Sequence, residues 1–331
     1  MLFDSSLRKE LGRSFGATLV VLITIVMTVM LIRTLGQATR GNVNPSEVML
    51  VMGFMVLGHL PTILTLSLFI AITATLTRMY ASSEMVVWFS SGQGLWSFLK
   101  PTLRFAWPVL LSVAVLALVV WDASGFDLPL ARWFGDASGF AHRRDWLLTK
   151  VLHDGARNAS WVLTALLTLM VWRPLGALRS LTRGERIGLL LGVLASVLAM
   201  SAIKRTSLTS CPWDLQEFGG TARCVSHWLW GVADGGGGNC FPAGHASAGF
   251  AYLAGWFWLR RVSPRAAAWW LGAALVLGFG LGAVQQVRGA HYMSHTLWTA
   301  WLCWTIGGAV WWLAAGRRTR PTTNGVPTRT R

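Results

Sequence analysis

The stretch IGLLLGVLASVLAMSAIKRT, residues 187–206, decides the class of fold. It stays apolar for about the 17 to 25 residues that a membrane-spanning helix needs, and it ends on Lys204. A charged side chain at a membrane boundary either reaches toward water or belongs to a site at that surface. The other apolar runs, and the polar residues at their ends, distinguish these two explanations.

The composition of the whole chain is that of a membrane protein. Of its 331 residues, 53% are hydrophobic and only 13% are charged. A net charge of +16 would favour nucleic-acid binding in a soluble protein, but here the basic residues form short clusters between apolar runs. We therefore expect a membrane environment and no nucleic-acid partner. The first run lacks a small-residue cleavage site, so we expect it to be retained as a helix.

Eight apolar runs predict an all-α, polytopic integral membrane protein. If the spans alternate from a cytoplasmic amino terminus, most Lys and Arg residues fall on the cytoplasmic side, which supports that orientation. Both termini are then cytoplasmic, and Lys204, His245 and His291 share the opposite, non-cytoplasmic surface of the membrane. The runs lie near residues 15–32, 55–77, 105–121, 159–172, 187–203, 246–259, 267–284 and 296–315.

The segments outside these runs have distinct compositions. Residues 122–158 mix apolar and charged side chains, which is typical of interfacial helices. Cys211, Cys224 and Cys240 flank or occupy one outer loop, where a disulfide could form between two of them. The basic tail, residues 317–331, is expected to be disordered in the cytoplasm.

Three polar blocks stand in order at the outer ends of helices. Lys204 is followed by CPWD at 211–214, then by PAGH at 242–245 and RGAHYMSH at 288–295. They resemble the signature of the type 2 phosphatidic acid phosphatase family, which is related to bacterial haloperoxidases: Lys-x6-Arg-Pro, Pro-Ser-Gly-His and Ser-Arg-x5-His-x3-Asp. The resemblance covers about residues 105–315 and implies a six-helix bundle. The matching positions are Lys204, Pro212, Pro242, Gly244, His245 and His291.

Five positions depart from that signature. Cys211 replaces Arg, Ala243 replaces Ser, Val284 and Gln285 replace Ser-Arg, and His295 replaces Asp. Phosphatase activity is therefore less strongly implied than the phosphatase fold. A phosphatase-fold lipid binder without turnover is an alternative.

The resemblance implies a role for each of the matching polar residues. His291 would attack phosphorus and become phosphohistidine, His245 would protonate the leaving oxygen, and Lys204 would hold the phosphate, without a metal or another cofactor. His295 lies four residues after His291, so on a helix it shares a face with His291 and could orient it in place of the carboxylate. This spacing also occurs between zinc ligands, but no HExxH-type base accompanies the pair, so no metal is expected.

Further groups are candidates for phosphate binding. Arg288 precedes His291 by three residues and could supply a displaced guanidinium, because positions 285 and 288 return to nearly the same helical face. Arg205 or Arg223 could instead compensate for the arginine missing at Cys211, with Asp214 fixing either one. The backbone amides of Ala243 and Gly244, at the start of a helix, are natural phosphate donors.

The first 121 residues resemble the amino-terminal part of LptF/LptG-type permeases of lipopolysaccharide export. The similar stretches are FDSSLRKELGRSF at 3–15, GHLPTILTLSLFIA at 58–71 and SSEMVVWFSSGQG at 82–94. In that family the loop after the second helix docks on an ATPase, so Glu84, in residues 78–104, could carry such a contact. The β-jellyroll and last three helices of the permease are absent.

We therefore interpret the chain as a fusion. Residues 1–104 form a permease-like segment, 105–316 a phosphatase-like domain whose first helix, 105–121, is shared, and 317–331 the tail. The expected function is removal of phosphate from a lipid phosphate or pyrophosphate; lipid A, undecaprenyl pyrophosphate, phosphatidylglycerol phosphate and phosphatidic acid are all admissible. The alternative is a non-catalytic subunit of lipopolysaccharide export that binds an ATPase.

Overall fold

A computed structural model describes residues 2–40, 48–92, 94–229 and 231–316, and it is almost entirely helical. The tail predicted for residues 317–331 lies outside the described residues. The chain divides into two compact units, residues 1–124 and 125–331, and each is described by itself. The fold class predicted from the sequence, an all-α polytopic membrane protein, is confirmed.

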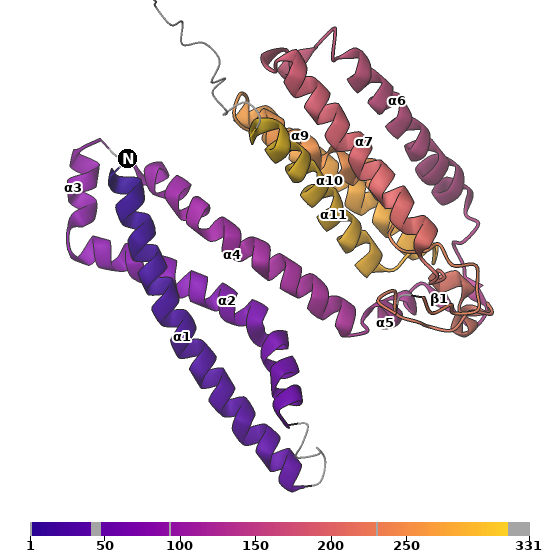
Figure 1. The fold of residues 1–331 in the computed structure, drawn as a ribbon, viewed down its shortest axis with the longest axis horizontal. Coiled ribbons are helices and arrows are strands. Elements are labelled where there is room, and N and C mark those ends of the chain that lie inside the picture. The colour runs from indigo at the N-terminus through magenta and orange to yellow at the C-terminus, as the bar shows by residue number, and fades with distance from the viewer. Residues whose placement is uncertain (1, 41–47, 93, 230, 317–331) are drawn as a thin grey trace, which may run out of the picture. The chain divides into compact units, whose positions relative to one another are not determined.

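The first unit consists of three long helices and one short one (Figure 1). They are α1 (Leu2–Thr39), α2 (Val48–Ala81), α3 (Glu84–Ser90) and α4 (Leu95–Ala123). Apolar side chains from these helices, including Leu11, Met79 and Met85, form a small core near the end of the unit that holds α3. An ion pair of 3.0 Å between Arg78 and Glu10 joins the end of α2 to the start of α1.

The helix predicted near residues 105–121 is part of α4, which packs against α1 and α2. The compact unit extends to Ser124, because α4 is one continuous helix from Leu95 to Ala123 despite the prolines at 101 and 108. The predicted sharing of residues 105–121 between the two parts stays a prediction.

The second unit is a bundle in which α6, α7, α9, α10 and α11 run side by side (Figure 1). A π-helix, Leu147–Gly155, continues directly into α6 (Ala156–Leu169). The other helices are α5 (Asp127–Ala131), α7 (Arg183–Thr206), α8 (Ser247–Phe250), α9 (Ala254–Leu259), α10 (Pro264–Val287) and α11 (Met293–Gly316). Short 3-10 turns occupy Gly176–Ser180, Pro212–Asp214, Gln216–Phe218 and Ala251–Leu253.

Local sequence sets where α7 and α10 begin and end. Thr182 and Glu185 form a reciprocal capping box that starts α7. Pro264 occupies the first position of α10, where its missing N–H costs nothing. Gly289, with φ of +74°, ends α10 in a left-handed conformation that favours glycine. These boundaries bring the end of α7, and the loops before α8 and α11, to the positions of the three polar blocks.

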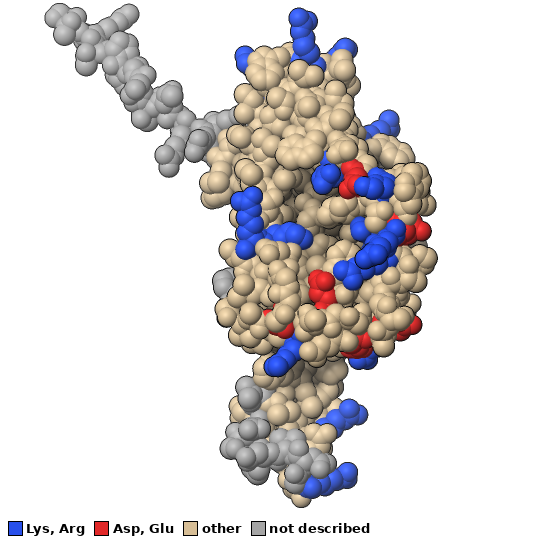
Figure 2. Space-filling view, turned by 90° about the vertical axis from the view of Figure 1, so that its right-hand side faces the viewer, with Lys and Arg blue, Asp and Glu red and all other residues tan. Residues whose placement is uncertain are grey.

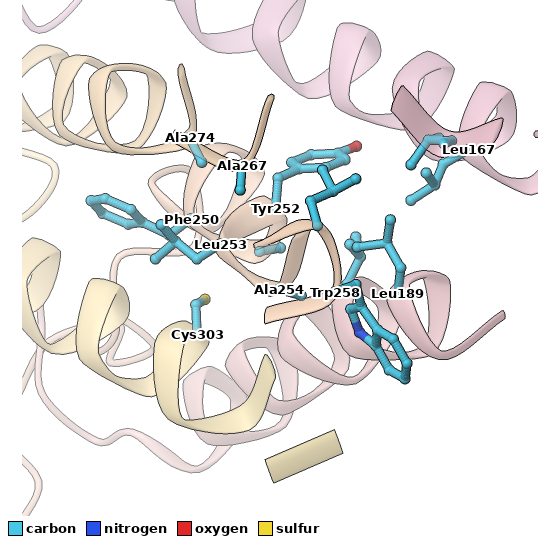
Figure 3. Packing of buried hydrophobic residues seen from close by; sticks show 14 of the residues in the cluster. Leu167, Leu189, Phe250, Tyr252, Leu253, Ala254, Trp258, Ala267, Ala274 and Cys303 are labelled. Carbon is cyan, nitrogen blue, oxygen red and sulfur yellow. The ribbon is translucent and has the colours of Figure 1, made fainter. Parts of the chain in front are cut away.

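The core of the second unit surrounds the short helices α8 and α9 (Figure 3). Phe250, Leu253 and Ala254 are fully or almost fully buried among residues of α7, α10 and α11. Glycines permit this close packing: a Cβ added at Gly249 would collide with the backbone of Gly278. The helices that carry the polar blocks are therefore held by a tightly packed interior.

A smaller cluster lies at the end of the bundle that carries the loops. Strands β1 (Gly135–Asp136) and β2 (Gly139–Phe140) pair antiparallel. Phe140 packs against Phe218, and both belong to a buried apolar cluster with Ala131 and Leu215. This cluster anchors residues 125–146 to the loop that follows α7.

Among the described residues, five helices meet both the length and the hydropathy expected of a membrane span: α1, α2, α4, α7 and α10. The other three predicted runs take different forms. The run near 159–172 is the 14-residue α6, which the preceding π-helix extends, and the run near 246–259 is broken into α8, a 3-10 turn and α9. The last run is the tryptophan-rich α11, 24 residues long. On the face shown in Figure 2, uncharged surface predominates, and the charged side chains are mostly Lys and Arg.

Candidate active site

The structure brings the three polar blocks to one end of the second unit. Lys204 lies in the last turn of α7, His245 two residues before α8, and His291 two residues before α11. A Cβ added at Gly244 would lie 3.6 Å from Cδ of Lys204, so the first and second blocks are in contact. The positive charge of Lys204 also acts on both imidazoles.

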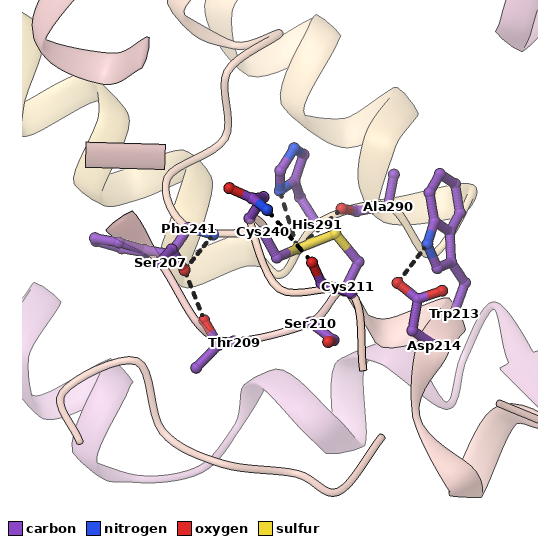
Figure 4. Close-up of a disulfide and its surroundings, with 12 residues drawn as sticks. Ser207, Thr209, Ser210, Cys211, Trp213, Asp214, Cys240, Phe241, Ala290 and His291 are labelled. Atoms are coloured by element: carbon purple, nitrogen blue, oxygen red, sulfur yellow. Dashed lines mark hydrogen bonds between the residues drawn. A yellow bond between two sulfur atoms is a disulfide. The ribbon is translucent and has the colours of Figure 1, made fainter. Parts of the chain in front are cut away.

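Three links fasten the blocks to one another. A disulfide joins Cys211 of the first block to Cys240, two residues before the second (Figure 4). The Trp213 amide donates to the carbonyl oxygen of Gly289, in the third block, at 2.9 Å. The Ala243 amide donates to Oγ1 of Thr299, on α11, at 3.0 Å. Side chains separated by up to 87 residues are thereby held in one place.

The disulfide shows which of the cysteine pairings left open by the sequence is formed. Cys211 pairs with Cys240, and Cys224 is free and exposed. Cys211 stands where the family signature has arginine, so a covalent crosslink occupies the place of a charged group.

His291 is buried, and its Nδ1 faces the disulfide (Figure 4). The distance from Nδ1 to Sγ of Cys240 is 3.5 Å. A disulfide sulfur carries no proton and can only accept, so in the tautomer with a proton on Nδ1 this N–H points at the sulfur and Nε2 keeps its lone pair. Burial holds the pKa of His291 well below its ordinary value, and the positive charge of Lys204 and the neighbouring His295 and His245 lower it further. The ring is therefore neutral at neutral pH, the form that a nucleophile requires.

His295 is buried on the first turns of α11. Its ring centroid lies 5.8 Å from that of His291, in an edge-to-face arrangement. The rings of His227 and Phe241 also meet it edge-on, at 5.4 and 5.2 Å. The orienting role expected of His295 stays a prediction, and the sulfur of Cys240 is a second group that lies beside the His291 ring.

His245 is half-buried and packs against His153, with 3.7 Å between ring centroids and 33° between the ring planes. Burial lowers the pKa of His245 to about 3, and the charges of His153, Lys204, Arg288 and Arg157 add to this effect. A dianionic phosphate bound among these cations would oppose the lowering. In the absence of an anion, His245 is a neutral imidazole.

The position of Arg288 is consistent with the predicted displacement of the family arginine from residue 285 to residue 288. Its Nη1 donates to Oε1 of Gln285, the position of the family arginine, at 3.1 Å, so the two side chains meet on one face. Cζ of Arg288 lies 5.8 Å from the ring of Trp213, and Cζ of Arg143 lies 4.7 Å from the same ring. Burial lowers the pKa of Arg288, and the negative charge of Asp154 opposes that effect.

Two expectations about the site need correction, and a third stays a prediction. The Ala243 amide is engaged by Thr299, so it does not point free into the site. Arg205 is exposed, because neighbouring helical positions point about 100° apart and Lys204 takes the side that faces the second block; its role in phosphate binding stays a prediction. Asp214 accepts from the indole N–H of Trp213 at 2.9 Å and lies 3.8 Å from Arg143, not from Arg205 or Arg223.

The helix that continues into α6 contributes a group of polar residues that the sequence analysis did not assign. His153 packs against His245, and its Nδ1 lies 2.9 Å from Oδ1 of Asp154. Lys150 and Arg157 lie 3.4 and 3.9 Å from the same carboxylate. The sequence does contain a signal for this group. Charged residues recur three and four positions apart just before an apolar run, and this spacing places them on one polar face of a helix.

A second cluster near His291 contains residue types that often bind metals. Within the part of the chain that the structure describes, Cys211, Cys240 and His291 place three potential ligand atoms within 4.8 Å of one another. Metals bind cysteine as thiolate, and here the two sulfurs are bonded to each other. In this form the group does not offer three ligands.

Comparison with protein families identifies both parts of the chain. Residues 7–123 match the model of the lipopolysaccharide export system permease LptF/LptG, and residues 186–319 match that of the PAP2 superfamily. No curated protein and no solved structure matches the chain. The first match ends at the last residue of α4, and the second contains all three polar blocks. The chain is thus a multi-pass membrane protein in which a segment that matches LptF/LptG permeases is fused to one that matches the PAP2 superfamily.

Proposed function

We propose that this protein removes phosphate from a membrane lipid phosphate or pyrophosphate through a phosphohistidine at His291. The observation that carries the proposal is that buried His291 lies at the same end of the second unit as Lys204 and His245, within a segment that matches the PAP2 superfamily. Phosphoryl transfer needs a nucleophile, cations for the equatorial oxygens and an acid for the leaving group. The residues around His291 can supply all three without a metal.

Each polar group has a proposed role in the first chemical step. His291 attacks phosphorus through Nε2 while its Nδ1–H remains on the disulfide sulfur. Lys204 binds phosphate oxygen as a point charge, and the Arg288 guanidinium supplies planar, directional donors. His245 lies on the side of the leaving oxygen. Arg157 adds a further positive charge near His245.

We also propose that the site opens to the periplasm and that both termini are cytoplasmic. Disulfides persist in oxidising compartments such as the bacterial periplasm and are rare in the cytosol, and Cys211–Cys240 lies within the site. The distribution of Lys and Arg along the sequence supports the same orientation. Labelling of single cysteines, introduced at Ala137 and Ala177 in a background without the free native thiols, would test this sidedness in intact cells.

The test of activity is phosphate release by the purified protein from a panel of lipids. The panel comprises lipid A, undecaprenyl pyrophosphate, phosphatidylglycerol phosphate and phosphatidic acid. We expect His291→Ala to abolish release from whichever lipid the wild type hydrolyses, because the nucleophile is lost. His142→Ala, which alters an exposed histidine of the same unit, is the matched control. Equal rates from the wild type and His291→Ala would overturn the proposal, and lipid binding without release would identify an inactive binder.

A second candidate function rests on the LptF/LptG match of residues 7–123. In this function the protein assembles with an export ATPase through residues 78–104. Helix α3 offers a small contact surface there, with Val86, Val87 and Phe89 exposed and Glu84 at its first turn. Co-purification with the ATPase, lost when Val86 and Val87 are changed to Asp, would support this role. Absence of association in both detergent and native membranes would refute it.

A further inference from the structure

Two arginines at the end of the bundle away from the candidate active site lie over one tryptophan. Arg260 and Arg261 directly follow α9, and their Cζ atoms lie 4.7 and 5.1 Å from the centroid of the Trp311 ring. Cζ of Arg260 also lies 5.6 Å from the ring of Phe257. Aromatic faces attract guanidinium groups, so these aromatic side chains hold two cations close to each other.

This arginine pair lies at the boundary of a membrane span. Helix α10, which meets the length and hydropathy expected of a span, begins at Pro264, shortly after Arg261. Helix α11 begins at Met293, beside His291, and reaches Trp311 about 27 Å further along its axis. Figure 1 shows α9 at the end of the bundle away from β1. The two guanidinium groups therefore lie at the level of lipid headgroups, at a surface distinct from the candidate active site.

The charge of the pair is not compensated within the part of the chain that the structure describes. No carboxylate there forms an ion pair with Arg260 or Arg261. Burial lowers the pKa of Arg260, and the positive charge of Arg261 lowers it further. An anion bound to both groups would offset this repulsion. Phosphate fits them well, because a planar guanidinium can donate two parallel hydrogen bonds to it.

The surface beside the pair is apolar and open. Trp312 and Leu313, which follow Trp311 on α11, are 67% and 56% exposed, and Val262, which follows Arg261, is 44% exposed. Exposed apolar side chains near the end of a membrane-spanning segment contact the lipid at its interface with water. The site therefore combines cations for a phosphate group with an adjoining apolar surface for hydrocarbon chains.

We propose that Arg260 and Arg261 bind the headgroup phosphate of an anionic phospholipid at the end of the bundle opposite the candidate active site. This inference does not rest on the proposed function, because the lipid is a ligand here and not a substrate. A zwitterionic phospholipid carries the same phosphate, but its ammonium group would be repelled by the two arginines. Free phosphate would lack the apolar contacts with Trp312 and Leu313.

Lipid binding by the full-length protein in detergent tests this site. Native mass spectrometry would measure the fraction of protein with one ligand bound during titration with phosphatidylglycerol, phosphatidylcholine or inorganic phosphate. Phosphatidylglycerol is a phosphodiester and so is not a substrate of the proposed reaction. We expect its Kd to rise about fivefold in Arg261→Gln and about thirtyfold when Arg260→Gln is added, from the usual contribution of one basic residue near an anionic lipid surface. Arg144→Gln, which removes an exposed charge elsewhere in the unit, is the matched control and should leave the Kd unchanged.

Arg261 is exposed, so its variant tests the site without disturbing the packing around Arg260. An unchanged Kd in Arg261→Gln would overturn the inference, and so would an equal rise in Arg144→Gln, which would indicate a general effect of net charge. Tighter binding of phosphatidylcholine or inorganic phosphate than of phosphatidylglycerol would refute the choice of an anionic lipid. Loss of phosphatidylglycerol binding in Lys204→Met but not in Arg261→Gln would place the lipid at the candidate active site instead.

Discussion

Replacing Cys211 and Cys240 by serine, or reducing their disulfide, removes the covalent link across the connection between α7 and α8. The two cysteines are 29 residues apart in sequence. The chain-entropy estimate for closing a loop of that length is about 3.6 kcal/mol at 25 °C. Backbone hydrogen bonds remain beside the link, including the Asn239 amide to Ser207 at 2.7 Å and the Cys240 amide to Thr209 at 3.0 Å. We therefore expect the loop to stay folded but to open more often.

Hydrogen exchange measures this opening directly. Each 1.4 kcal/mol is a factor of ten in an equilibrium constant, so the amides of Trp213 and Cys240 should exchange up to a few hundredfold faster after reduction. Phosphatase activity should fall in parallel, because the sulfur that contacts Nδ1 of His291 is freed to move. Cys224→Ser, which changes the exposed free thiol, should affect neither measurement. Exchange unchanged by reduction at both amides would refute this reasoning, as would a peptide map that links Cys224 to Cys211 or Cys240.

Three further predictions concern charge, packing and pH. Lys204→Met should raise KM and lower kcat/KM by about tenfold or more, because a charge-assisted phosphate contact is lost. Lys204→Arg should keep part of the wild-type kcat/KM. Unchanged steady-state kinetics for Lys204→Met would contradict this prediction. Gly249→Ala should destabilise the protein by about 1 to 3 kcal/mol, because the new methyl group meets the backbone of Gly278. Gly272→Ala, in open space on α10, should be neutral or slightly stabilising in the same thermal unfolding assay. The pKa of His245 is lowered from 6.5 to about 3, so between these pH values the unfolded chain binds more protons than the folded chain. The free energy of unfolding should therefore be highest above pH 6.5 and should fall as the pH falls toward 3. The fall should be smaller in His245→Gln.

Much of the architecture could be predicted from local sequence patterns. Apolar runs of spanning length predicted an all-α membrane protein because the bilayer requires such helices. The order and spacing of Lys204, His245 and His291 predicted one site, and the structure brings their segments to the same end of the bundle. Helix breaks were less predictable. The run at 246–259 divides into α8, a 3-10 turn and α9, and its fit among α7, α10 and α11 depends on glycine contacts that no local pattern records.

What the sequence determined by itself was therefore the membrane class, the family signature and the residues able to do phosphoryl chemistry. Only the tertiary structure decided which groups these residues contact. Cys211 pairs with Cys240 and not Cys224, and the amide of Ala243 is taken by Thr299. His153 lies on His245 although 92 residues separate them, because the helix that carries it packs beside the loop before α8. Residue type fixes which chemistry is available, whereas the contact between distant segments fixes which groups meet, and that contact depends on how all the helices pack at once.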